Sequence, residues 1–184
     1  MVRVGPGVEW PGHPHGDPRM SVTVYLGLGA NLGDRAAAIV GAVARLEAAG
    51  LVHDLVLSPL YETDAVADQP QPPYLNAVAR ALTDLPAPAL LAGCLAVEAA
   101  LGRVRPAGVD KAPRVIDIDL LLYGEAVLDL VEDGVALRVP HPAMLQRPFV
   151  LIPLADVARP GLVHPGTGQP LVVAAPSPGV RRRP

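Results

Sequence analysis

Two aspartates in the stretch "APRVIDIDLLLYG", residues 112–124, are the residues whose type and spacing point most directly to chemistry. Asp117 and Asp119 stand two positions apart in an apolar run typical of a strand, so both carboxylates project from the same face. Neighbouring like charges repel each other and lose hydration when buried, which costs free energy unless a cation lies between them. Mg²⁺ takes oxygen ligands and often joins one or two carboxylates to substrate phosphates. Solvated carboxylates on an exposed sheet face, or pairing with nearby arginines, are the alternatives.

Cationic residues precede this strand: Arg103, Arg105, Lys111 and Arg114. Clustered positive charge beside a carboxylate pair suits a phosphate chain, whose charge a metal and the arginines neutralise together. An ordinary salt-bridged surface is the alternative interpretation. In a regular strand, Arg114 would project from the face opposite to the aspartates. Its side chain can reach the same site only if the backbone twists at Pro113.

Three more residues are candidates for a site. Glu98 lies on the apolar stripe of a predicted helix, where it either holds one of the arginines or is partly exposed at the helix end. His141, in "VPHPAMLQRPF", is a possible donor to a nucleotide or phosphate, or a structural residue after a proline. Phe149, the only phenylalanine, fits a position in the core.

The elements that must position these residues follow from periodicity and caps. In chain order we expect a strand over 21–29, a helix from the N-cap Asp34 to about Gly50, a strand over 51–63, a loop over 64–73, a strand over 74–84, a helix over 86–102 and the strand with the aspartates. Ile39, Val40, Val43 and Leu46 form the apolar stripe of the first helix. The order β-α-β-β-α-β predicts an α+β fold, a ferredoxin-like βαββαβ sandwich.

Additional elements are expected after this unit. Short strands around 126–130 and 136–139 are predicted to extend the sheet, and a helical portion over 144–157 to pack nearby. We expect a flexible N-terminal extension over 1–20, one domain over 21–175 and a loose C-terminal tail over 176–184.

Composition limits the classes of protein. With 184 residues, half of them apolar, the chain can form one domain with a full core. The net charge of −3 gives no electrostatic argument for a nucleic-acid partner or an anionic membrane. The single cysteine, Cys94, cannot form a disulfide within the chain and fits a cytoplasmic location and a buried core position. We expect no membrane span and a monomer or weak dimer.

Several stretches together carry a resemblance. They are "YLGLGANLGDR", "SPLYET", "QPPYLNAVA", "EAALGRVR", "PRVIDIDLLLYG" and "VPHPAMLQRPFVLIPL". Their order resembles that of the 6-hydroxymethyl-7,8-dihydropterin pyrophosphokinases of folate synthesis, over about Val24 to Leu154. The resemblance implies a ferredoxin-like fold and transfer of the β,γ-pyrophosphoryl group of ATP to the pterin's hydroxymethyl oxygen, with release of AMP.

The resemblance also implies roles for the charged residues. Asp117 and Asp119 would hold two Mg²⁺ ions that bridge the triphosphate. Arg103 and Arg114 match the family's catalytic arginines, which supply positive charge as the bridge between the α- and β-phosphates breaks.

On the ATP side, Glu98 matches a carboxylate near the nucleotide and His141 a residue that contacts ATP. Arg105 is expected on the same side, and Lys111 is expected to replace positive charge lost from the loop that precedes the strand.

The resemblance implies a specific pterin pocket. Asn76 matches the side chain that binds the amide edge of the ring, and a wrong ring would leave that buried amide unpaired. Phe149 matches the aromatic that stacks on the ring, and Tyr74 lines the same pocket. Thr63 and Val66 match positions whose backbone contacts the pterin.

The loop over 106–113 departs from the family pattern. Its sequence "PAGVDKA" lacks the usual aromatic and is one residue longer, and Asp64 and Ala65 stand where the family favours prolines. We expect a lid that orders only when ATP, Mg²⁺ and pterin are bound. Another Mg²⁺-dependent nucleotide transferase and a non-catalytic ferredoxin-like ligand-binding module are the alternative functions.

Overall fold

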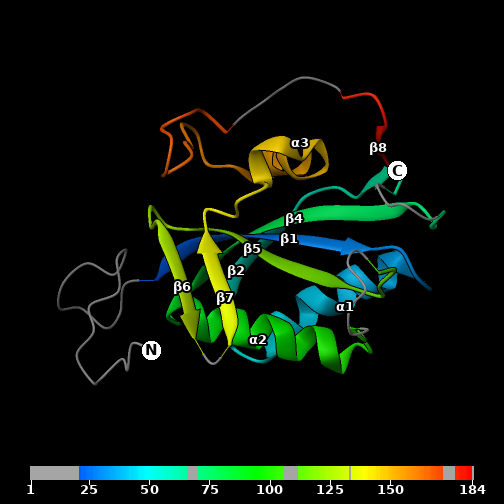
Figure 1. The fold of residues 1–184 in the computed structure, drawn as a ribbon, viewed down its shortest axis with the longest axis horizontal. Helices are drawn as coiled ribbons and strands as arrows, with labels where there is room; N and C mark the ends of the chain where they lie inside the picture. Colours follow the sequence, from blue (N-terminus) through cyan, green and yellow to red (C-terminus); the bar gives the residue numbers. More distant parts are fainter. Residues whose placement is uncertain (1–20, 66–69, 106–111, 133, 172–176, 184) are drawn as a thin grey trace.

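A computed structural model describes residues 21–65, 70–105, 112–132, 134–171 and 177–183 (Figure 1). Its helices and strands are β1 Val22–Ala30, α1 Arg35–Ala48, β2 His53–Leu57, β3 Tyr61–Thr63, β4 Tyr74–Thr83, α2 Ala87–Ala100, β5 Asp117–Tyr123, β6 Leu128–Glu132, β7 Val135–Val139, the 3₁₀ turn η1 Met144–Gln146, α3 Pro148–Val157 and β8 Val180–Arg182. The extension expected over 1–20 lies outside the described residues, as do the lid residues 106–111. No helix in the described ranges has both the length and the apolarity needed to cross a membrane.

The main sheet has the strand order β5-β1-β4-β3-β8, and β2 also pairs with β4. The pairings are antiparallel throughout. If β2 and β3 are counted as one interrupted strand, the chain runs β-α-β-β-α-β with the last strand beside the first. Helices α1 and α2 cover one face of the sheet and α3 lies over the other (Figure 1). The predicted ferredoxin-like α+β sandwich is confirmed, with its additional strands and helix.

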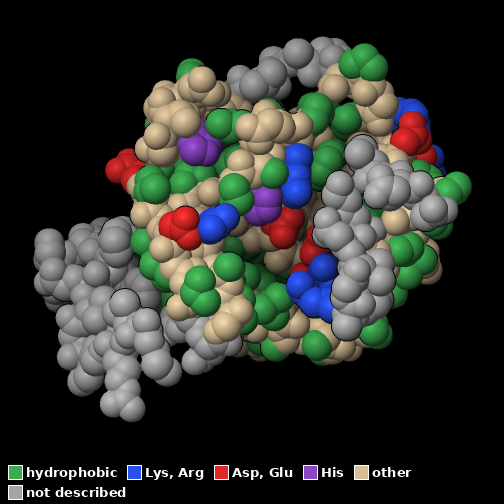
Figure 2. Space-filling view, in the orientation of Figure 1, with side chains coloured by type: hydrophobic (Ala, Val, Ile, Leu, Met, Phe, Trp, Pro, Cys, Tyr) green, Lys and Arg blue, Asp and Glu red, His purple; other side chains and the backbone are tan. Residues whose placement is uncertain are grey.

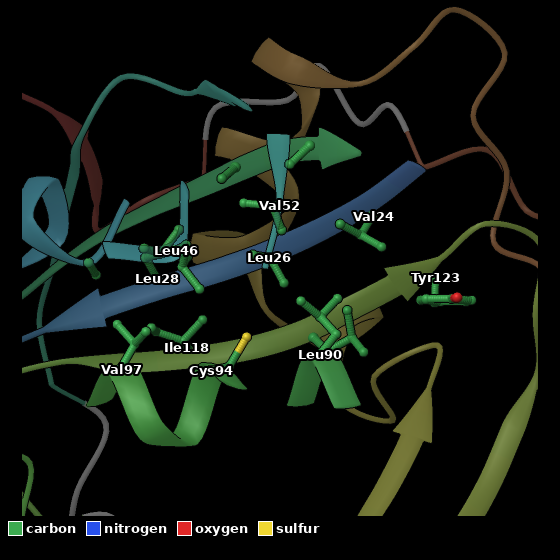
Figure 3. Close-up of a cluster of buried hydrophobic side chains, with 14 of the residues drawn as sticks. Val24, Leu26, Leu28, Leu46, Val52, Leu90, Cys94, Val97, Ile118 and Tyr123 are labelled. Carbon is green, nitrogen blue, oxygen red and sulfur yellow. The ribbon is translucent and has the colours of Figure 1, made fainter. Parts of the chain in front are cut away.

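The main core lies between the sheet and helices α1 and α2. Alternate residues of β1 point into it, because side chains of a strand alternate between faces: Val22, Val24, Leu26 and Leu28 are at most 6% exposed. Leu90 and Cys94 of α2 meet them from the helix side (Figure 3). Burial raises the pKa of the Cys94 thiol to about 12, so it stays protonated and apolar, as expected of a core cysteine.

Helix α1 follows its sequence signals closely. The Asp34 side chain caps the helix by accepting a hydrogen bond from the Ala37 backbone N–H at 3.0 Å. The buried stripe consists of Ile39, Ala42 and Leu46. Val40, expected on this stripe, is 57% exposed because it lies about a quarter turn away from Ile39.

The strand predicted over 51–63 is instead two strands, β2 and β3, separated by Ser58–Leu60. Ser58 ends the first pairing: its backbone N–H donates to the Val78 carbonyl at 2.9 Å, and its Oγ accepts from the Val78 N–H at 3.0 Å. Pro59 then has no N–H for the ladder. Both strands still pair with β4, so the overall topology is unchanged.

A bulge in β5 changes which residues face the core. Tyr25 pairs with Leu122 and Leu26 with Leu120, so Leu121 is an extra residue on β5. The alternation expected for the strand therefore holds only before the bulge. Tyr123 joins the main core, whereas Leu122 belongs to the smaller cluster under α3. The aspartates precede the bulge and lie on the α3 face, opposite Ile118.

The two segments after β5 also differ from expectation. Strands β6 and β7 form a separate two-stranded sheet and do not extend the main one. Leu128, Leu137 and Val139 bury one face of this hairpin against the main core.

Part of the tail expected to be loose over 176–184 is ordered as a strand. β8 pairs with β3, and the Arg183 N–H donates to the Leu60 carbonyl at 2.8 Å. The physical reason is that β3 otherwise presents an unpaired edge, which a passing segment can pair with.

Candidate active site

A pocket of about 590 Å³ opens on the α3 face of the sheet. Strands β1, β3, β4 and β5, the start of α3 and the segment before β8 supply its walls. Seven of the predicted site residues line it: Thr63, Tyr74, Asn76, Arg114, Asp117, Asp119 and Phe149. In Figure 2, acidic, basic and histidine side chains gather near the middle of the visible surface. Val66 and Lys111 lie outside the described residues.

The carboxylates are paired with cations. Arg103 Nη1 donates to Asp117 Oδ1, and Arg114 Nη2 lies 3.1 Å from Asp117 Oδ2. Arg147 Nη1 is 3.6 Å from Asp119 Oδ2. Pairing with arginines, one of the alternatives open from the sequence, is therefore observed. It does not close the site to a ligand, because the side chains of Asp117 and Asp119 remain 17% and 37% exposed in the pocket.

Arg114 precedes β5, which begins only at Asp117. The alternation of side chains along a strand therefore does not fix its direction, and its guanidinium reaches Asp117. Its backbone N–H donates to Asn31 Oδ1 at 2.8 Å, and its guanidinium lies over the Tyr74 ring at 5.4 Å. Its Nε is buried and has no hydrogen-bond partner among the described residues.

Glu98 lies beneath the pocket and does not line it, and it holds two arginines, one of the two interpretations open from the sequence. Its side chain is 2% exposed and accepts from Arg103 Nη1 at 2.9 Å, Arg105 Nη2 at 2.5 Å and the Ile118 N–H at 2.7 Å. Burial raises the pKa of the Glu98 carboxyl, and the Ile118 and arginine hydrogen bonds oppose that shift. Glu98 therefore holds Arg103 against Asp117. Arg105, 58% exposed, contacts Glu98 rather than the pocket.

His141 stands behind Asp119, with its Nε2 4.0 Å from Asp119 Oδ2, and it does not line the pocket itself. Its Nδ1 accepts from the Ala143 N–H at 3.2 Å, which assigns the ring proton of the neutral form to Nε2, the nitrogen facing Asp119. Burial lowers the pKa of His141, while Asp119 opposes the shift. Burial also raises the pKa of Asp119, and the Asp117 charge adds to this.

Another part of the pocket wall suits a flat polar ring. Asn76 Nδ2 donates to Thr63 Oγ1 at 2.9 Å, and both side chains are buried. This leaves the Asn76 carbonyl oxygen as an acceptor at the pocket wall. A Cβ added at Gly29 would lie 3.3 Å from that oxygen, so the glycine keeps the space in front of it open. Tyr74 and Phe149 provide two aromatic surfaces.

Sequence analysis missed two residues of the site. Arg147, which contacts Asp119, also lies over the Phe149 ring at 5.7 Å. The signal was its place just before Pro148 and Phe149 at the start of α3. Asn31 is 2% exposed, and besides Arg114 it contacts Gln71 at 3.1 Å through Nδ2. The signal was a polar residue directly after the apolar strand β1.

The two carboxylates fit a Mg²⁺ ion whose other ligands are water and substrate phosphate. They do not form a site in which the protein supplies every ligand. In the ranges the structure describes, no three His, Cys, Asp or Glu side chains are grouped to hold a metal ion. Two carboxylates on one strand face are hard oxygen donors that leave most of a coordination shell open. Mg²⁺ accepts such sites because it keeps several waters and binds substrate phosphates.

Without Mg²⁺, Asp119→Asn is expected to stabilise the fold at neutral pH. Folding raises the pKa of the Asp119 carboxyl. Such a group stabilises the folded protein below its unfolded pKa of about 3.9, and this stabilisation is lost as pH rises through the pKa of the folded state. The asparagine has no such loss. We expect its melting temperature to exceed that of the parent by about 2 °C at pH 7, a modest shift because the site is partly solvated.

Thermal unfolding in EDTA from pH 4 to pH 8 measures this difference. It should shrink towards pH 4, and Asp129→Asn, on the exposed hairpin, should show no comparable trend. A parent protein that is more stable than Asp119→Asn at pH 7 would contradict the expectation.

Comparison with known proteins identifies a family for this chain. The family model described as 7,8-dihydro-6-hydroxymethylpterin-pyrophosphokinase (HPPK) matches residues 25–159. The 2-amino-4-hydroxy-6-hydroxymethyldihydropteridine pyrophosphokinase of Methylorubrum extorquens is 45% identical over 142 residues, 77% of this chain and 85% of that protein. The folic acid synthesis protein fol1 of Schizosaccharomyces pombe is 38% identical over 160 residues, 85% of this chain. The chain spans only about a fifth (21%) of the length of that fungal protein.

A solved structure supports the fold independently. A Plasmodium falciparum HPPK-DHPS protein superposes with a TM-score of 0.65 at 13% identity, over 83% of this chain and 43% of that one. At this identity the similarity concerns the fold alone. The family match covers most of the chain and includes every strand and helix that lines the pocket except β1's first residues and β8. The chain therefore belongs to the 7,8-dihydro-6-hydroxymethylpterin-pyrophosphokinase (HPPK) family.

Proposed function

We propose that this protein transfers pyrophosphate from ATP to 6-hydroxymethyl-7,8-dihydropterin, a step of folate synthesis. The observation that carries the proposal is one pocket lined both by the aspartates, Arg114 and Arg147 and by Asn76, Tyr74 and Phe149. The pterin hydroxyl oxygen attacks the β-phosphorus, and the bond from that phosphorus to the oxygen bridging it to the α-phosphate breaks. AMP leaves, and the hydroxyl proton is lost.

Asp117 and Asp119 would hold the metal, which we propose to be two Mg²⁺ ions. Bound there, Mg²⁺ would supply positive charge to the phosphate oxygens and polarise the attacking hydroxyl. The support is the donor chemistry of two partly exposed carboxylates on one strand face. His141, whose Nε2 lies 4.0 Å from Asp119 Oδ2, would stand beside this metal ligand.

Arg103 and Arg114 would stabilise the charge that spreads over the phosphate oxygens in a loose transition state. Both already lie on Asp117, and Glu98 holds Arg103 from below. Their positive charge is therefore preorganised and needs little rearrangement when the reaction occurs. Arg147, on Asp119, provides a third guanidinium on the other side. Lys111 and Arg105 would add positive charge at the ATP end.

Asn76 and Thr63 would bind the polar edge of the pterin, and Tyr74 and Phe149 its faces. Val66 is proposed to contribute a backbone contact. A pocket with a few placed polar groups among aromatic walls is the usual composition of a specific site for a flat ligand.

Asn76→Ala is expected to weaken pterin binding by about 10- to 100-fold, because an unmade hydrogen bond leaves a ring edge desolvated without a partner. Phe149→Ala should weaken it by about tenfold through lost stacking. ATP affinity should change little in either variant. Calorimetric titration with each ligand separately measures both effects, with Gln169→Ala as a control outside the pocket. Equal losses for ATP and pterin would contradict the assignment of this end of the pocket.

Incubation of the protein with ATP, Mg²⁺ and 6-hydroxymethyl-7,8-dihydropterin tests the proposed reaction. AMP and the pterin diphosphate should appear in equal amounts. ADP in place of AMP would indicate a different nucleotide-dependent transferase, and pterin binding without turnover would indicate a binding module.

We further propose that the enzyme acts in the cytoplasm as a monomer or weak dimer. The support is the single buried Cys94, which needs no oxidising compartment. Light scattering at micromolar concentration measures the oligomeric state.

A further inference from the structure

We propose that the segment Ser177–Arg183, here called the β8 segment, is a wall of the heterocycle subsite and sets its affinity for the pterin. Ser177, Pro178, Gly179 and Val180 line the same pocket as Thr63 and Asn76. The inference rests on the proposed function, because it assigns the β8 segment to the pterin end of that site.

The position of β8 in the sheet places the segment at the end of the pocket away from the phosphate chemistry. The aspartates lie on β5 at one edge of the main sheet, whereas β8 lies at the other, beyond β1, β4 and β3. Four strand spacings of ~4.8 Å separate the two edges by roughly 19 Å. The phosphate chemistry therefore lies towards β5, and the β8 segment lies on the side of Thr63 and Asn76.

Register connects the segment directly to the pterin-binding residues. Val180 pairs with Thr63, which in turn pairs with Tyr74 on β4. The Thr63 hydroxyl accepts from Asn76 Nδ2 at 2.9 Å. A shift of β8 therefore moves the strand that orients Asn76 as well as the wall itself.

The wall is a preformed turn. The Val180 N–H donates to the Ser177 carbonyl at 3.1 Å, and Gly179 has φ of +87°. Proline followed by a glycine with positive φ is the signature of a type II turn. Pro178 restricts the backbone before the ligand arrives, so little conformational entropy is lost on binding.

Charge pairs hold the segment in register beside the pocket. Arg181 Nη2 lies 3.2 Å from Asp64 and 3.9 Å from Glu62, and Arg35 contacts Glu62 at 3.1 Å. Each exposed ion pair alone contributes little to the free energy of unfolding. Together these pairs connect β8, β3 and α1 beside the pocket. A one-residue slip of β8 would separate Arg181 from both carboxylates.

The test measures KM for each substrate, from AMP formation, in two full-length variants. Val180→Ala removes part of the wall without changing the backbone, and Gly179→Ala displaces the turn, because alanine is strained at this φ although no atom lies within 4 Å of the added Cβ. We expect the KM for pterin to rise about five- to tenfold in each variant, with the KM for ATP and kcat within about twofold of the parent.

Two matched controls separate this role from a general effect on the fold. Gly168→Ala introduces the same type of strain, at φ of +69° with open space around the Cβ, but outside the pocket. Val163→Ala shortens a 45% exposed valine that does not line the pocket. Both should keep the parent's KM values.

The outcomes are distinguishable. A selective rise in the KM for pterin, absent from both controls, supports the β8 segment as a wall of the heterocycle subsite. Active variants with unchanged pterin KM would overturn the inference, and so would an equal rise for both substrates with a lower melting temperature. A parent protein that forms no AMP would instead overturn the proposed function.

Discussion

Asp117→Asn and Asp119→Asn are each expected to lower kcat by at least about 10³-fold. Asparagine keeps the size of the side chain but removes the negative charge that binds Mg²⁺. Without the metal, most of the negative charge on the phosphate chain is no longer neutralised. A loss of this size corresponds to about 4 kcal/mol of transition-state stabilisation. The rate of AMP formation at saturating substrates, with Mg²⁺ varied over a wide range, measures it.

The two variants should differ in stability although both lose activity. Asp117 pairs with Arg103 and Arg114, so its replacement leaves two guanidinium groups with fewer acceptors. Asp119 is instead the carboxyl whose pKa is raised by burial and by Asp117, so its replacement relieves repulsion. Asp129→Asn, which breaks an exposed pair with Arg138 on the hairpin, is the matched control and should keep normal turnover. Near-normal activity of both site variants at ordinary Mg²⁺ would refute the metal assignment.

Glu98→Ala is expected to reduce the free energy of unfolding by about 3–5 kcal/mol. The substitution leaves Arg103, 9% exposed, without one of its two carboxylate partners, and it removes the acceptor of the buried Ile118 N–H. Urea denaturation without ligands measures the change. Glu98→Gln keeps the volume and part of the hydrogen bonding, so we expect an intermediate loss.

Glu47→Ala provides the comparison for this experiment. Glu47 is exposed on α1, and its loss should change the free energy of unfolding by less than about 0.5 kcal/mol. If Glu98→Ala were as stable as Glu47→Ala, the buried carboxylate would not be the support for Arg103. Glu98 acts through Arg103 and does not line the pocket, so Glu98→Gln should lower kcat more than it raises the KM for ATP.

Much of the site could be predicted because its charged residues stand in otherwise apolar segments, which is visible over a few positions of the sequence. Two carboxylates two positions apart in an apolar strand require compensation, and a glutamate on the apolar side of a helix requires a partner. The structure shows both features. Asp117 forms ion pairs with Arg103 and Arg114, and Glu98 forms ion pairs with Arg103 and Arg105. The Asp34 cap and apolar periodicity likewise determined α1, and prolines at the start with a glycine after the end bounded α2. These signals depend only on residues a few positions apart.

Only the tertiary structure decided the remaining features, and all of them depend on residues far apart in the chain. The bulge at Leu121, which exchanges the faces of Leu122 and Tyr123, arises from pairing with β1, almost a hundred residues earlier. Arg147 reaches Asp119 because α3 packs across the open face of the sheet. The segment at 180–182 is charged and lacks an apolar alternation, yet it forms a strand because β3 offers an unpaired edge and carboxylates beside it. Periodicity records which face of an element is buried, but it carries no information about which distant strand, edge or charge will meet it.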